Sequence, residues 1–132
     1  MSSKSNYLEL KVLDHFLGTT ESSFVTQKYL ALHTANPAED GSGAEVSNSN
    51  NYSRQAINFN SASSGSATNT GDVSFTASGG GFGTITHFGI WDNASHGAGN
   101  LIYYGALTAS KTIADGDTIK FASNTGITIT ED

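Results

Sequence analysis

Four histidines are the side chains in this sequence best suited to bind a metal ion. They stand at positions 15, 33, 87 and 96, and no two of them form an H-x-H or H-x-x-x-H pair. A zinc site needs several such ligands at one point, and the chain has no cysteine to supply the others. His33 and His87 lie in strand-like segments and could meet across a sheet, but the favoured interpretation is that each makes a local hydrogen bond in a half-buried strand. The sequence therefore predicts no metal site and no cofactor.

The sequence also gives no good support for a catalytic serine or for a phosphate-binding loop. None of the 18 serines stands in a G-x-S-x-G elbow, the strained turn that exposes a catalytic serine. Residues 79–83 hold four glycines around Phe82, but a strand follows them and no lysine, which predicts a bend and not a phosphate-binding loop. Residues 115–117 (DGD) resemble the start of a calcium loop without its later ligands, which predicts a hairpin turn. We expect no catalytic residue and no enzymatic activity.

One aromatic group has the composition of a sugar-binding platform. Trp91, Tyr103 and Tyr104 supply flat faces for stacking, and Asp92 and Asn93 supply a carboxylate and an amide for hydroxyl groups. The alternative is that Trp91 and one tyrosine fill the core. The core interpretation is the favoured one, and the five residues are kept as a candidate glycan-binding site.

The composition excludes several classes of partner. The chain has 132 residues and a net charge of −6, with six Lys and Arg in total, too few and too scattered to neutralise nucleic-acid phosphates. No uncharged apolar run approaches the length that crosses a bilayer, and the first ten residues lack the apolar core of a signal peptide. We therefore expect no nucleic-acid or membrane partner.

Residues 6–17 are the one segment with a helical pattern. Asn6 is the expected N-cap, Glu9 completes a capping box, and Gly18 is expected to end the helix in a left-handed conformation. The apolar residues form two adjacent stripes and make up a candidate protein interface: Leu8, Leu10, Val12, Leu13, Phe16 and Leu17.

After Gly18 the apolar pattern changes to a period of two. Strands are predicted at residues 29–34, 52–59, 72–76, 84–92, 101–107, 111–113, 118–122 and 127–130. Residues 60–71 contain no large apolar side chain and predict a loop. Short strands at this spacing are typical of all-β domains, so the fold prediction is one domain: an N-terminal helix and an antiparallel β-sandwich or jelly-roll-like domain over residues 24–130.

The order of short motifs along the chain resembles small structural proteins of tailed bacteriophages. The motifs are residues 29–37 (YLALHTANP), 45–47 (EVS), 52–57 (YSRQAI), 85–92 (ITHFGIWD), 105–107 (GAL) and 116–121 (GDTIKF). The N-terminal segment fits as well, with residues 6–9 (NYLE) and 13–15 (LDH), so the resemblance covers the chain from about residue 5 to 130. Members of this group are described as tail-fibre-like, minor tail or capsid decoration proteins. The resemblance therefore implies a virion component, made in the host cytoplasm, without cofactor or catalytic residues.

The size of the chain favours one role within that group. A single domain without a repetitive shaft fits a capsid decoration, or cement, protein that bridges major capsid subunits on the virion surface. A tail or tail-fibre-associated protein bound to other tail proteins is the first alternative, and a host-glycan-binding module is the second. Because the helix offers more apolar surface than one small sheet covers, we also expect a homo-oligomer, most simply a homotrimer.

Overall fold

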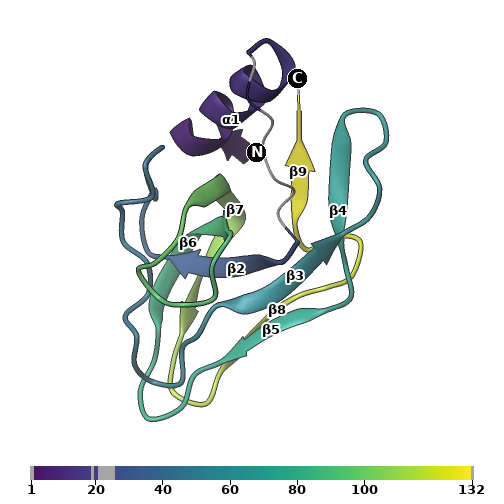
Figure 1. Ribbon diagram of the computed structural model, residues 1–132. Coiled ribbons are helices and arrows are strands. Elements are labelled where there is room, and N and C mark those ends of the chain that lie inside the picture. Colours follow the sequence, from purple (N-terminus) through teal and green to yellow (C-terminus); the bar gives the residue numbers. More distant parts are fainter. Residues whose placement is uncertain (1, 19, 21–25, 132) are drawn as a thin grey trace.

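Short antiparallel strands dominate the computed structural model, which describes residues 2–18, 20 and 26–131 (Figure 1). Its elements are β1 (Ser2–Lys4), α1 (Asn6–Phe16), β2 (Lys28–His33), β3 (Gln55–Phe59), β4 (Ser66–Thr70), β5 (Val73–Thr76), β6 (Gly83–Trp91), β7 (Leu101–Ile113), β8 (Thr118–Phe121) and β9 (Thr128–Thr130). This architecture confirms the all-β prediction with one N-terminal helix. The first residues of the predicted 24–130 range, 24 and 25, lie outside the described part of the chain.

Seven strands form one sheet in the order β1-β7-β6-β2-β3-β4-β9, while β5 and β8 pair in a second sheet. Residues 101–107 and 111–113 were expected as two strands, but they belong to the single strand β7. The register of β6 and β7 shifts between Ile85 and His87, and such irregularities bend a strand pair. The bend lets one long strand replace two short ones.

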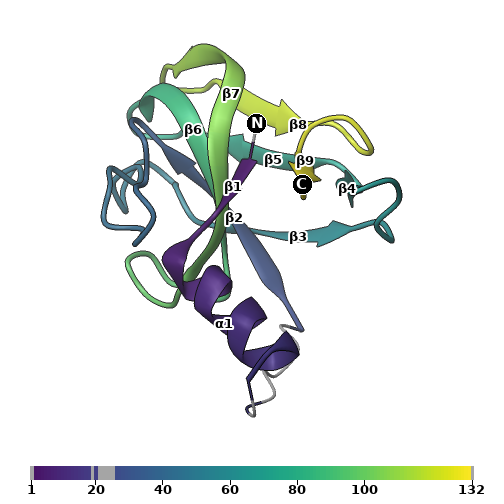
Figure 2. The same ribbon diagram turned by 90° about the horizontal axis from the view of Figure 1, so that it is seen from above.

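The two edges of the large sheet meet at a seam between β1 and β9. Lys4 Nζ lies 2.9 Å from Glu131 Oε2, and the Thr130 N–H donates to Ser2 Oγ at 3.0 Å. Figure 2 shows the two chain ends on the same side of the molecule. Side-chain contacts therefore bring the sheet close to a closed barrel.

The core lies between the concave face of the large sheet and the β5–β8 pair. Its fully buried aliphatic side chains alternate along the strands, as the period of two predicted. The largest of them are Leu30, Leu32, Ile57, Ile85, Ile90 and Ile127.

The predicted loop 60–71 is wrong over residues 66–70, which form β4 between β3 and β9. The fully buried Asn69 explains how a segment without large apolar residues joins the sheet. Its Oδ1 accepts from the Ile127 N–H at 3.0 Å, and its Nδ2 donates to the carbonyls of Gly71 and Ala122. A buried amide with three hydrogen bonds thus takes the place of an apolar anchor.

The prediction for residues 115–117 is confirmed as a turn and wrong as a hairpin. The Asp117 N–H donates to the Ala114 carbonyl at 3.0 Å, and Gly116 has a φ of 86°. However, β8 pairs with β5 and not with the preceding β7. The turn carries the chain from one sheet to the other. The glycine segment bends at residues 79 and 80, as predicted, and Gly83 already belongs to β6.

The helix is present, but both predicted caps are wrong. Ser5, one residue earlier than expected, is the N-cap, so Asn6 already belongs to α1 and the capping box with Glu9 does not form. At the other end Leu17 is the C-cap in a right-handed conformation, and Gly18 has no positive φ. The Gly18 N–H instead donates to the Asp14 carbonyl at 3.1 Å, which closes the last turn.

Candidate functional site

Ser5 fixes the start of α1 against the barrel. Its hydroxyl oxygen accepts from the Leu8 N–H at 3.2 Å and donates to the Leu101 carbonyl, and the whole residue is buried. The next residue, Asn6, donates its N–H to the Glu39 carbonyl at 3.0 Å. These contacts tie the first turn to β7 and to the loop before Glu45, so they set the direction in which α1 leaves the sheet. Figure 2 shows α1 projecting beyond the strands.

Most of the apolar surface of α1 faces outward. Of the six residues predicted as an interface, Leu8 and Val12 are half-buried and none is fully buried. The exposed fractions of the other four are 62% for Leu10, 52% for Leu13, 74% for Phe16 and 80% for Leu17. Leu10, Leu13 and Leu17 have the 3–4 spacing that places side chains on one helix face, which Phe16 extends toward the C-terminal end. We call these four residues the α1 face.

A buried ion pair holds the loops beneath the helix. Arg54 donates from its Nε to Glu45 Oε2 at 2.9 Å and from its Nη2 to Glu45 Oε1 at 2.7 Å. The Tyr52 hydroxyl donates to the same Oε2 at 2.8 Å and accepts from the Leu32 N–H at 3.1 Å. Burial would raise the pKa of Glu45, but the hydrogen bonds from Arg54 and Tyr52 and the charge of Arg54 outweigh it and lower that pKa. Glu45 is therefore an anion that holds its loop.

Arg54 also anchors the loop between β6 and β7. Its Nη1 donates to the carbonyls of Asn93 at 2.8 Å and Ala98 at 2.9 Å. Its guanidinium lies 4.1 Å from the ring centroid of Trp91, a cation–π distance. All of these donors bind groups of the same chain, so the contacts of Arg54 connect the loops around β2 and β6 to one another.

The predicted sugar platform is not assembled. Trp91 is 6% exposed, with the Arg54 guanidinium against its ring and His33 stacked at 6.3 Å between ring centroids. Tyr103 and Tyr104 are neighbours on β7 and so point to opposite faces, Tyr104 toward Trp91 and Tyr103 away from it. No aromatic face of Trp91 is left for a ligand to stack on.

The polar members of that platform serve the loop itself. The Asp92 carboxylate accepts from the Asn100 N–H at 2.6 Å and from its amide at 3.0 Å. Asn93 Oδ1 accepts from the Ser95 N–H at 2.8 Å. Both side chains close turns of the loop over residues 92–100.

Two of the four histidines lie side by side in the sheet, since His33 and His87 are register partners on β2 and β6. His33 Nδ1 lies 2.8 Å from the Gly43 carbonyl and therefore carries the proton, while His87 Nδ1 contacts Thr86 Oγ1 at 2.8 Å. Burial lowers the pKa of His33. Within residues 2–18, 20 and 26–131, no three His, Asp or Glu side chains gather to hold a metal ion.

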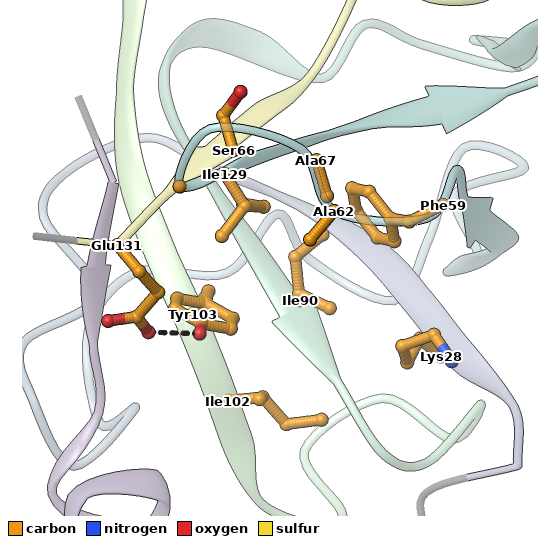
Figure 3. A pocket seen from close by; sticks show the side chains of 11 residues that line it. Lys28, Phe59, Ala62, Ser66, Ala67, Ile90, Ile102, Tyr103, Ile129 and Glu131 are labelled. Carbon is orange, nitrogen blue, oxygen red and sulfur yellow. Dashed lines mark hydrogen bonds between the residues drawn. The ribbon is translucent and has the colours of Figure 1, made fainter.

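An apolar pocket of about 240 Å³ opens between the β6–β7 side of the barrel and the β4–β9 edge (Figure 3). Its walls are almost entirely apolar. The lining side chains include Phe59, Ala67, Ile90, Ile102 and Ile129. Nothing in the sequence pattern indicated this pocket, because its lining comes from six strands that only the closed sheet brings together.

Charged groups stand on opposite sides of the pocket. Figure 3 shows Lys28 on one side, and Tyr103 with its hydroxyl directed at Glu131 on the other. Burial and the hydrogen bond to Glu131 raise the pKa of Tyr103. Burial would raise the pKa of Glu131, but the hydrogen bonds from Tyr103 and Lys4 outweigh it and lower that pKa. The pocket therefore has the Lys4–Glu131 ion pair of the seam on one side and Lys28 on the other.

Comparison with known families gives a match over nearly the whole chain. Residues 3–130 match the family model described as podophage GP4 fiber I protein gp80. The chain belongs to this family. The match confirms the resemblance to small, fibre-like structural proteins of tailed-phage virions. Among individual curated proteins, no significant match is found.

Within the described residues, no helix is both long enough and apolar enough to cross a bilayer. The Arg54–Glu45 pair was missed, although Arg54 is the only arginine of the chain and stands at the start of an apolar strand. That position was the one signal from which a buried ion pair could have been inferred.

Proposed function

We propose that this protein is a non-enzymatic structural component of a podophage virion, associated with the tail fibre. The family match carries the proposal, because it covers α1 and every strand from β2 to β9 and its description names a fibre protein. That description favours the tail or tail-fibre alternative over the capsid cement role suggested by the size of the chain.

The structure fits a part that holds neighbouring parts in place. Its buried charges, Arg54 and Glu45, bind each other and backbone carbonyls, which stiffens the loops that seat α1. Its largest apolar side chains on the surface gather on the α1 face. Burying one Leu or Phe side chain is worth about 1.5–3 kcal/mol, so two or three per contact favour association. Self-association, most simply as a homotrimer, and binding to other tail proteins both follow from this surface.

Gold labelling of purified particles with an antibody to this protein tests the proposal. Gold confined to the tail is the expected result, and gold spread over the head would support the cement role instead. Particles that lack the protein give a second readout. A fibre component is expected to lower adsorption to host cells, whereas a cement protein would lower the temperature at which heads release their genome.

A further inference from the structure

The chain carries both halves of a possible contact between copies: an exposed apolar projection and an apolar pocket. Phe16 stands at the end of α1 with 74% of its surface exposed, so the pocket of its own chain does not hold it. The pocket, at about 240 Å³, is larger than the apolar cavity of about 150 Å³ that suffices for a benzene molecule. A phenylalanine ring therefore fits it in size and in polarity.

We propose that the pocket of each copy takes the Phe16 ring of a second copy, in a head-to-tail contact. The proposal deepens the self-association part of the proposed function and rests on it. A contact of this kind uses two different patches of one molecule, so each copy has one patch left for the next copy. Repeated contacts close into a ring when the rotation between copies permits, which is how a trimer would form.

Charge favours one orientation of the incoming helix. The C-terminal end of a helix carries a partial negative charge from its last carbonyls, and Asp14 in the last turn of α1 adds a full one. Lys28 stands on one side of the pocket and Glu131 on the other. The negative end of α1 is therefore expected to approach on the Lys28 side, because Glu131 on the other side is a carboxylate already paired with Lys4.

The rest of the α1 face extends the contact. Leu13 and Leu10 lie one and two turns back from Phe16 along the exposed side of the helix. With Phe16 seated, they would rest on the apolar margin of the pocket near Phe59. Association thus covers the whole exposed apolar stripe, which a small domain in water does not normally leave open.

Sedimentation of full-length variants tests the contact from both sides. Phe16→Ala removes the ring and is expected to weaken association about 30-fold or more, the size of an interface hot spot. Ala67→Phe fills the pocket from within β4 and is expected to have the same effect. Thr70→Phe adds the same ring to an exposed position of β4 and is the matched control, which should associate like the wild type. Circular dichroism confirms that each variant is folded.

Mixing the two defective variants distinguishes this contact from a helix-to-helix contact. The Phe16→Ala copy keeps its pocket and the Ala67→Phe copy keeps its ring, so together they should form dimers and nothing larger. Normal association of Ala67→Phe alone would overturn the proposal, and so would a wild type that stays monomeric at about 100 μM. Either result leaves the virion role intact, since particle labelling tests that role separately.

A photo-crosslinking residue at position 16 locates the occupant directly. The expected product joins position 16 of an unlabelled chain to a pocket residue of a ¹⁵N-labelled chain, and its yield rises with protein concentration. Cross-links confined to one chain, at a yield independent of concentration, would overturn the proposal.

Discussion

Replacing Arg54 by methionine is expected to destabilise the protein more than any surface change. The substitution keeps an unbranched side chain as far as the ε position but removes both hydrogen bonds to Glu45 and those to the carbonyls of Asn93 and Ala98. The Arg54 side chain is fully buried and that of Glu45 is 9% exposed, so water screens the remaining carboxylate poorly.

The expected magnitude follows from those contacts. Removing one partner of a buried ion pair costs about 3–5 kcal/mol, because the other charge stays buried without compensation. Each carbonyl left without a donor adds about 1–3 kcal/mol where water cannot reach it. Because the loop that holds these two carbonyls is exposed, we expect a total of about 4 kcal/mol, a large share of the 5–15 kcal/mol that is typical of a domain.

Urea denaturation of four proteins measures this cost: wild type, Arg54→Met, Glu45→Gln and the double variant. The double variant has no uncompensated charge, so it should be more stable than Arg54→Met alone. A cost below about 1 kcal/mol for Arg54→Met at an unchanged m-value would refute the reasoning, and so would simple additivity of the two single variants.

Three more perturbations have defined outcomes. Ser5→Ala removes the helix cap and leaves the Leu101 carbonyl without its donor. We expect this variant to lower the free energy of unfolding by about 2 kcal/mol or more, and a change near zero would contradict the anchoring role of Ser5. Gly89→Ala should lower the Tm, because a Cβ there would lie 2.8 Å from Trp91 Nε1 and 2.9 Å from His33 Nε2. A Tm equal to that of the wild type would show that these rings shift to make room. Burial lowers the pKa of His33 in the folded state, so the unfolded chain takes up its proton first, and stability should fall as the pH drops below about 6.5. His33→Asn keeps a donor for the Gly43 carbonyl and should flatten that part of the profile in denaturation series at several pH values, whereas an unchanged profile would assign the dependence to other groups.

The sequence by itself determined the class of fold and most of its strands. Alternation of large apolar and polar residues follows directly from the two faces of a strand, so segments such as residues 84–92, observed as Gly83–Trp91, were predicted nearly to the residue. Other local patterns predicted the helix, from apolar residues at helical spacing, and the turn at residues 115–117, from its Asp-Gly pair. Motif order along the chain predicted the phage structural group that the family match confirms.

Only the tertiary structure decided the features that depend on distant partners. β4 joins the sheet because the buried Asn69 amide finds carbonyl and N–H groups up to 58 positions away in the chain. Ser5 replaces Asn6 as the N-cap because its hydroxyl also reaches a carbonyl of β7. A local pattern contains no information about such contacts.

The candidate site shows the same division. The apolar residues of α1 were read from their spacing, but which of them remain exposed depends on how Ser5 directs the helix against β7. Trp91 was a candidate for sugar stacking from its sequence neighbours, but in the structure Arg54 and His33 lie against its ring. The pocket exists only because side chains at the β1–β9 seam hold the sheet in a nearly closed barrel. Side-chain pattern along the chain thus fixes which surfaces are apolar, whereas closure of the sheet fixes which of them are buried, exposed or hollow.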